Sequence, residues 1–306
     1  MKPNLQTSFA GMVLQNPLVL ASGTCAFGRE FGEIFDLGKL GGVCSKGLTL
    51  RPRPGNTGIR IRETAGGIMN SIGLENPGVP AFIEKELPFM RSLGAPSRRP
   101  AAIVNLGGDS IDEYLEALDL LNDADFDILE LNISCPNVQA GGMAFGIKTE
   151  TAREVTRAAR GRCRHTLMVK LSPNAEDPVA LARACEEEGA DAVSLVNTFL
   201  AMAVDIERRK PVFANTYAGL SGPAIKPIAL RMVHQVAGAL KIPVMGCGGI
   251  ASWQDAAEFI MAGAAAVQIG TASLIKPDIS LDILKGLEAW MEKTGIADIN
   301  EIRGIV

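Results

Sequence analysis

A cysteine stands between a serine and a proline at the point where an apolar run of the sequence ends. The run DILELNIS (127–134) is rich in isoleucine and leucine, and Cys135 and Pro136 follow it directly. Because proline cannot continue a strand ladder, Cys135 is expected on a loop at the exit of a strand. A thiol in that position can reach a ligand and exchange a proton with it. The alternative is a structural cysteine, which packs as a small apolar side chain.

Polar side chains end several other apolar runs, where packing alone would not select them. A single polar residue of this kind is more often a rim residue whose hydrogen bonds are satisfied. Several together, two of them lysines, indicate a cage around an anionic ligand rich in hydrogen-bonding groups, because unpaired ammonium groups are costly to bury. The residues of this predicted cage are Lys46, Asn105, Asn132, Lys170, Asn197 and Thr198.

Two glycine turns, GCGGI (246–250) and IGTA (269–272), each lead from an apolar run into a helical pattern. Glycines there leave backbone N–H groups free to bind an anion, and the loops after the last two strands of a barrel commonly form its phosphate site. We therefore predict a site for a mononucleotide such as FMN, the alternative being two ordinary turns. No G-x-G-x-x-G motif follows an early strand, so a dinucleotide is not expected to bind in the Rossmann manner.

Eight short apolar runs alternate with eight amphipathic ones and must position these residues. The pattern predicts a parallel sheet covered by helices, and eight units are the number in a closed (β/α)8 TIM barrel of the α/β class. No linker interrupts the pattern, so residues 1–306 are expected to form one domain. The predicted strands are residues 18–23, 42–49, 101–107, 127–134, 166–173, 192–198, 243–249 and 266–272.

Three connections are longer than usual for such units, namely 50–76, 135–148 and 199–223. All three follow strands, so they are expected as insertions on the C-terminal face of the barrel, where barrel enzymes keep their active sites. Cys135 begins the second of them, which favours a functional thiol.

Composition argues against several classes of function. A formal net charge of −4 offers no basic face for nucleic acid. Polar residues break the first 23 residues before an apolar run grows long enough for a signal peptide or a membrane span, so a cytoplasmic protein is expected. The six cysteines form no C-x-x-C pair, so no metal or iron–sulfur site is expected in this chain. The two histidines, His165 and His234, are poor material for a hydrolase.

The sequence resembles the dihydroorotate dehydrogenases of class 1. From about Asn16 to Ile275 it carries, in order, NPLVLASGT, SKGLTL, MNSIGLENPG, NISCPNV, VKLSPN, SGPAIKPIALRMV and GCGGI. The family is a (β/α)8 barrel that holds FMN and oxidises dihydroorotate to orotate in de novo pyrimidine biosynthesis. Class 2 members use a serine base and carry an N-terminal membrane extension, whereas Cys135 and the polar start here indicate class 1.

Two segments, NISCPNVQAGGMAFG and GLSGPAIKPIALRMV, resemble class 1B. In that class the barrel pairs with a subunit that carries FAD and a 2Fe-2S cluster, and electrons pass to NAD. The resemblance implies a homodimer of this chain within a heterotetramer.

The resemblance also implies roles for individual residues, with Cys135 as the general base. The sequence departs from common family forms at Cys25, Ser71, Ala218 and His234, of which only Ser71 lies in a substrate segment. Cofactor contacts would come from Ser22, Lys46, Gly47, Asn105, Asn132, Lys170, Val196, Gly222, Gly248, Gly249, Gly270 and Thr271. Substrate contacts would come from Lys46, Asn70, Ser71, Ile72, Gly73, Leu74, Asn132, Asn197 and Thr198.

The implied chemistry agrees with the residue types. Dihydroorotate loses a proton from C5 and a hydride from C6, so a base is needed on one face of the ring and the flavin on the other. A thiol has an ordinary pKa of about 8.5, close enough to neutral pH to serve as that base. Lys170 would favour negative charge on the reduced flavin, and Lys46 with the asparagines would hold the orotate carboxylate and amides.

Other activities fit parts of the pattern. A fumarate-linked enzyme of class 1A would reoxidise its flavin without a partner. A dihydropyrimidine dehydrogenase-like FMN barrel also uses a Cys-Pro loop and would prefer dihydrouracil to dihydroorotate. A Schiff-base aldolase using Lys170 would bind a sugar phosphate and be colourless, and a purely structural barrel would bind nothing.

Overall fold

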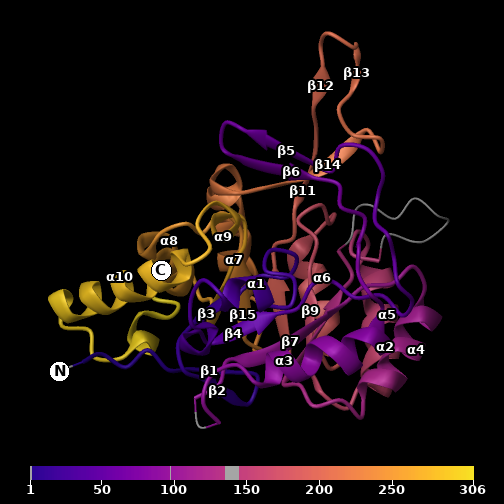
Figure 1. The fold of residues 1–306 in the computed structure, drawn as a ribbon. Helices are drawn as coiled ribbons and strands as arrows, with labels where there is room; N and C mark the ends of the chain where they lie inside the picture. The colour runs from indigo at the N-terminus through magenta and orange to yellow at the C-terminus, as the bar shows by residue number, and fades with distance from the viewer. Residues whose placement is uncertain (1, 97, 135–144) are drawn as a thin grey trace.

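Eight parallel strands close into a barrel in the order β10-β15-β16-β3-β4-β7-β8-β9. The computed structural model describes residues 2–96, 98–134 and 145–306, and Figure 1 shows the barrel with its covering helices. The predicted (β/α)8 fold is confirmed, and every predicted strand is present. The barrel strands are β3 (Leu18–Leu20), β4 (Gly42–Cys44), β7 (Ala101–Leu106), β8 (Ile128–Asn132), β9 (Thr166–Lys170), β10 (Ala192–Leu195), β15 (Val244–Cys247) and β16 (Ala266–Ile269).

The barrel strands are buried on both faces, which explains their nearly continuous apolar sequences. Side chains alternate across a strand, so Val19 and Ile103 fill the barrel interior while their neighbours pack against the helices. A hairpin of β1 (Thr7–Phe9) and β2 (Met12–Leu14) closes the N-terminal end of the barrel, with Phe9 fully buried in the interior cluster. The polar chemistry is thereby left to the opposite end.

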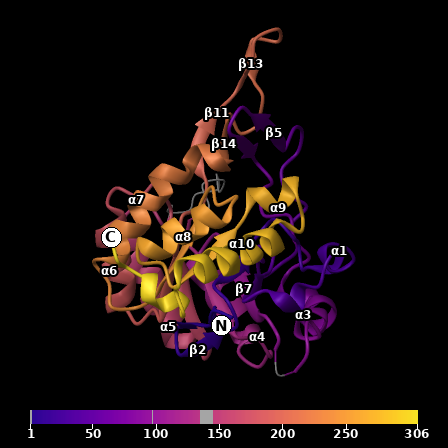
Figure 2. The ribbon, with the colours of Figure 1, turned by 90° about the vertical axis from the view of Figure 1, so that its left-hand side faces the viewer.

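Helices surround the barrel on its outer side (Figures 1 and 2). Their sequences supply their own caps: Ser110 accepts from the Glu113 N–H at the start of α4, and Asp177 caps α6 just before Pro178. No helix in the described ranges is long and apolar enough to cross a bilayer. The α-helices are α1 (Arg29–Gly32), α2 (Val79–Ala81), α3 (Leu87–Arg91), α4 (Ile111–Leu121), α5 (Thr149–Arg162), α6 (Pro178–Glu187), α7 (Lys226–Ala237), α8 (Trp253–Met261), α9 (Thr271–Ile275) and α10 (Ile279–Thr294). Shorter turns are η1 (Leu37–Lys39), the π-helical turn η2 (Phe82–Glu86), η3 (Pro223–Ile225) and η4 (Ile299–Ile302).

Two of the long connections form a small antiparallel sheet at the C-terminal end of the barrel, in the order β11-β14-β6-β5. Figure 1 shows this sheet above the barrel, with the hairpin of β12 and β13 extending beyond it. The connections 50–76 and 199–223 therefore lie where the sequence placed them, although no strands were predicted within them. Most of the third, 135–148, lies outside the described residues. The strands are β5 (Ile61–Thr64), β6 (Gly67–Asn70), β11 (Phe199–Met202), β12 (Val204–Asp205), β13 (Lys210–Pro211) and β14 (Tyr217–Ser221).

Candidate active site

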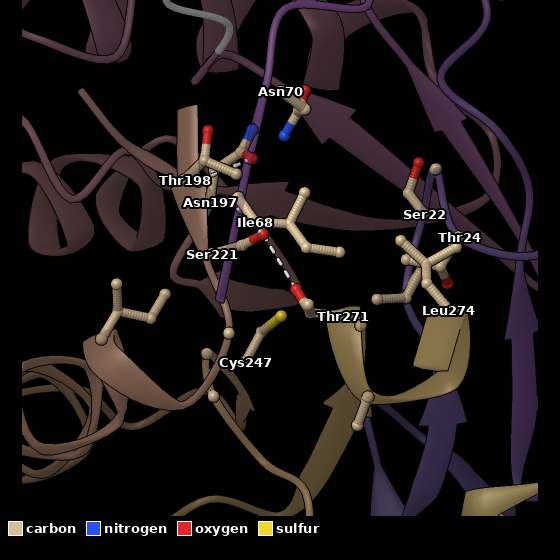
Figure 3. Close-up of a pocket in the computed structure, with 18 of the residues that line it drawn as sticks. Ser22, Thr24, Ile68, Asn70, Asn197, Thr198, Ser221, Cys247, Thr271 and Leu274 are labelled. Atoms are coloured by element: carbon tan, nitrogen blue, oxygen red, sulfur yellow. Dashed lines mark hydrogen bonds between the residues drawn. The ribbon is translucent and has the colours of Figure 1, made fainter. Parts of the chain in front are cut away.

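A cavity of about 500 Å³ opens at the C-terminal end of the barrel, beside the small sheet. Its volume is within the range of ligand pockets, about 300–1,000 Å³. Figure 3 shows Asn197 and Thr198 on one side of it and Ser22 and Thr24 on the other. The predicted site residues that line the cavity are Ser22, Lys46, Gly47, Asn70, Ile72, Gly73, Leu74, Asn132, Lys170, Val196, Asn197, Thr198, Gly222, Gly248, Gly249, Gly270 and Thr271.

Two predicted site residues lie behind the cavity wall. Asn105 is fully buried on β7, where its Oδ1 accepts from Asn132 Nδ2 at 3.3 Å. The Ser71 hydroxyl accepts from Asn56 Nδ2 at 3.1 Å, so it joins two parts of the connection that follows β4. Both residues are placed to orient wall residues and loops. Cys135, the predicted base, lies outside the described residues.

Ser134, the residue that precedes Cys135 in the chain, links Asn132 and Asn197, whose amides form one side of the cavity (the amide side). The Ser134 hydroxyl donates to Asn132 Oδ1 at 2.7 Å and accepts from Asn197 Nδ2 at 2.7 Å. The ends of β8 and β10 are thereby held together. Ser134 is buried and its partners are wall residues, so the last described residue before Cys135 lies at the edge of the cavity.

Two lysines carry positive charge at the inner wall. Lys46 is half-buried after β4, and within the described part of the chain its ammonium has no ion-pair partner. Lys170 is 4% exposed at the end of β9, and its Nζ lies 3.5 Å from Glu130 Oε2. An unpaired ammonium facing a cavity favours an anionic ligand, since it otherwise gives up hydration without compensation.

Glu130 is the main residue that the sequence reasoning missed. Its carboxylate is fully buried on β8 and accepts hydrogen bonds from Ser194 Oγ and Gln268 Nε2 at 2.7 Å, from Asn105 Nδ2 at 2.5 Å and from Cys44 Sγ at 3.3 Å. The alternation of side chains along the strand could have identified it. Glu130 is two residues from both Ile128 and Asn132, so all three share the inner face of β8.

Lys170 and Glu130 fix each other's charge. Burial alone would raise the pKa of Glu130, but Lys170 and the hydrogen bonds to the carboxylate hold that pKa below its ordinary value. Burial alone would lower the pKa of Lys170, but the Glu130 carboxylate holds that pKa above its ordinary value. Both groups are therefore charged at neutral pH.

The glycine turn after β15 gives the wall a backbone surface. Gly249 has φ +75°, and a Cβ there would lie 2.8 Å from the carbonyl oxygen of Gly222. In the described ranges the N–H group of Gly249 donates no backbone hydrogen bond. Thr271, at the next turn, donates to Ser221 Oγ at 2.8 Å (Figure 3). A free N–H group in a turn that only glycine fits is suited to an anion such as phosphate.

The cysteines that the structure describes are poor nucleophiles. Burial raises the pKa of Cys25 and of Cys185 to about 12. Burial likewise raises the pKa of Cys44, of Cys163 and of Cys247. A raised thiol pKa means that little thiolate is present at neutral pH, and the thiolate is the form that reacts.

Iodoacetamide added to the native chain at pH 8 is expected to alkylate Cys135 first. Each of the other five cysteines gains thiolate only as the pH rises toward its raised pKa, so its labelling should increase steeply above pH 8. Peptide mass spectrometry over a pH series measures this, with the urea-denatured chain, in which all six should react, as the control. Labelling of Cys247 before Cys135 at pH 8 would contradict the assignment of Cys135 as the reactive thiol.

Comparison with known proteins agrees with this geometry. The family model described as "Dihydroorotate dehydrogenase" matches residues 4–291. The chain is 54% identical over 301 residues to a Petrotoga mobilis protein named dihydroorotate dehydrogenase B (NAD(+)), catalytic subunit, covering 98% of this chain and 99% of that one. Proteins of the same name from Trichlorobacter lovleyi and Alkaliphilus metalliredigens are 51% and 50% identical, each over 99% of both chains. The resemblance noted in the sequence is thereby confirmed, and the chain belongs to the dihydroorotate dehydrogenase family.

Proposed function

We propose that this chain is the FMN-binding catalytic subunit of an NAD-linked dihydroorotate dehydrogenase of class 1B and works in pyrimidine biosynthesis. The observation that carries the proposal is the single cavity wall that combines Lys46, Lys170, several amides and a glycine turn. A chain about half identical to proteins named as such catalytic subunits, over nearly its full length, supports the same activity.

The residues present fit FMN. The free N–H group of Gly249, in the glycine turn after β15, suits its phosphate, and Lys170 and Asn132 suit the polar edge of its ring. The cavity is also large enough for a planar ring beside a small substrate. When bound, FMN supplies a hydride acceptor.

The remaining wall residues would bind and orient dihydroorotate. Lys46, with no ion-pair partner in the part of the chain described, would hold the carboxylate. Asn70, Asn132 and Asn197 would hydrogen-bond the ring amides, and the contacts of Ser134 keep two of these side chains in place. Fixed donors of this kind need no rearrangement as charge develops on the ring.

Cys135 would accept the proton from C5. It follows Ser134, whose side chain joins two wall asparagines, so the base would enter the cavity from the amide side. The five thiols with raised pKa values are unsuited to that role.

A second subunit would carry electrons onward. The relatives are named catalytic subunits and NAD(+) enzymes, which implies a companion chain in those proteins. For this chain we propose a partner with FAD and a 2Fe-2S cluster, in a heterotetramer built on a homodimer of the barrel, in the cytoplasm.

The purified chain is expected to be yellow, with about one FMN per chain, and dihydroorotate but not dihydrouracil should bleach it. Identification of the chromophore released by denaturation, together with anaerobic spectra, tests this. A colourless chain that cannot be reconstituted with FMN would refute the proposal that this chain is a flavoenzyme.

Two glycine variants locate the cofactor in the same experiment. Gly249→Ala should lose FMN, because its Cβ would collide with the Gly222 carbonyl and with Lys226 at 2.8 Å. Gly295→Ala is the matched control: its φ of +76° imposes similar backbone strain, but no atom lies within 4 Å of the added Cβ. Equal FMN content in the two variants would place the phosphate elsewhere.

A further inference from the structure

The carboxylate of Glu130 lies one layer below the cavity and is absent from its described lining, whereas Lys170 is part of that lining. The partners of Glu130 come from five other strands: Cys44 from β4, Asn105 from β7, Lys170 from β9, Ser194 from β10 and Gln268 from β16. Most of the barrel strands thus converge on one carboxylate directly behind one cavity cation.

Barrel closure does not require this arrangement. The layer below it is filled by apolar side chains such as Val19, Ile103 and Met168. A buried ion pair is often no more stabilising than apolar residues of the same volume, because both ions give up their hydration. The polar layer lies only where the barrel meets the cavity, which indicates a role in the site.

Gln268 fixes the direction of the lysine. Its Nε2 donates to Glu130 Oε1 at 2.7 Å, and its Oε1 accepts from Lys170 Nζ at 3.1 Å. The amide cannot rotate without facing the lysine with a donor and the carboxylate with an acceptor. An ammonium has three N–H donors, and Glu130 and Gln268 take two, so the third is left for the cavity.

We propose that Glu130 is a positioning residue that acts through Lys170, holding the ammonium charged and, with Gln268, directing it at the flavin ring. The inference rests on the proposed function in one respect, namely that the ligand beside Lys170 is FMN. Burial would otherwise favour neutral lysine, and the effect of Glu130 on the Lys170 pKa agrees with this role.

The test is Glu130→Gln, which preserves shape and removes the charge. With ¹³C-labelled lysines, the Cε signal of Lys170, assigned by its loss in Lys170→Met, should titrate above the exposed lysines in the wild-type chain and below them in Glu130→Gln. This measurement needs no dihydroorotate, so it stands even if the proposed substrate is wrong. An unchanged titration would overturn the inference.

The pH profile of flavin reduction is the functional readout. In Glu130→Gln the rate should fall as the pH rises through the lowered Lys170 pKa, since the lysine loses its charge there, whereas the wild-type rate should show no such fall over that range. Asp127→Asn is the matched control: it lies just before β8 and its carboxylate is 2.7 Å from Arg91 Nη1, so the same change breaks an ion pair away from the cavity. It should leave both the titration and the profile unchanged.

A double variant separates action through Lys170 from a merely structural role. If Glu130 acts through Lys170, Glu130→Gln with Lys170→Met should reduce flavin no more slowly than Lys170→Met alone, whereas losses that multiply would refute the inference. Should Glu130→Gln fail to fold, Gln268→Met keeps the charges of Glu130 and Lys170 and removes only the hydrogen bonds that orient the ammonium. Lys170 should then stay charged while FMN binds several-fold more weakly. FMN affinity equal to wild type would then count against the proposal.

Discussion

Replacing Cys135 with alanine is expected to slow reduction of the bound flavin by dihydroorotate by about 10² or more, the usual scale for loss of a general base. FMN and orotate should still bind, because the cation and amide contacts lie on other residues, such as Lys46 and Asn132. Stopped-flow absorbance of the flavin under anaerobic conditions measures the effect directly.

Two further variants make this result specific. Cys135→Ser should keep some activity that grows at high pH. A serine hydroxyl is a much weaker acid than a thiol, so its deprotonated form, which could act as the base, becomes available only as the pH rises. Cys163→Ala is the matched control: this thiol is buried against the His165 carbonyl and lies outside the cavity lining. It should reduce flavin at the wild-type rate. Near-normal rates for Cys135→Ala would move the base to another residue.

The second large effect concerns the electron acceptor. The chain alone is expected to pass electrons from dihydroorotate to an artificial dye but scarcely to NAD, because its sequence carries neither a dinucleotide fingerprint nor a cysteine cluster for iron and sulfur. Co-expression with a subunit that carries FAD and an iron–sulfur cluster should raise NAD reduction from near background to steady turnover. Steady-state assays with NAD, fumarate and dye measure this, and vigorous fumarate use by the chain alone would indicate a class 1A enzyme instead.

The rim of the cavity suggests where such a partner docks. Leu274 and Ile275 on α9 line the cavity and are 49% and 73% exposed, and Ile61 on β5 is 54% exposed. Exposed apolar groups beside the proposed cofactor site suit a docking surface that keeps electron transfer short.

A charge at this rim should separate docking from chemistry. Ile275→Asp is expected to lower NAD reduction by the complex while FMN content and dye reduction persist. Val13→Asp, at a similarly exposed position on the hairpin that closes the opposite end of the barrel, should leave all three unchanged. Equal NAD rates in the two variants would place the partner on another surface.

Local sequence pattern was enough to predict the barrel. Each strand is a run of apolar residues with buried faces, each helix carries its own amphipathic period and often its own cap, and the count of eight leads to closure. The same reasoning placed Lys46, Lys170 and the asparagines at one end, because the carboxyl ends of parallel strands all point the same way. Most of the predicted site residues therefore line the cavity.

Pairings between distant segments could not be read from local pattern. Strand β6 pairs with β14, whose residues are far away in the sequence. The sequence of either insertion alone therefore does not predict the sheet. For the same reason the role of Glu130 could not be predicted. A single carboxylate in an apolar strand has no evident partner in the sequence, because Gln268, Ser194 and Asn105, which hydrogen-bond it, come from other strands.

Depth within the site was likewise decided by the tertiary structure. Asn105 and Lys170 both follow apolar residues near strand ends, yet Asn105 lies behind the wall and Lys170 in it. Sequence type and strand position set which residues gather at the cavity end of the barrel. Which of them meets the ligand depends on the stagger of neighbouring strands around the closed barrel, because that stagger fixes how far along the barrel axis each side chain stands.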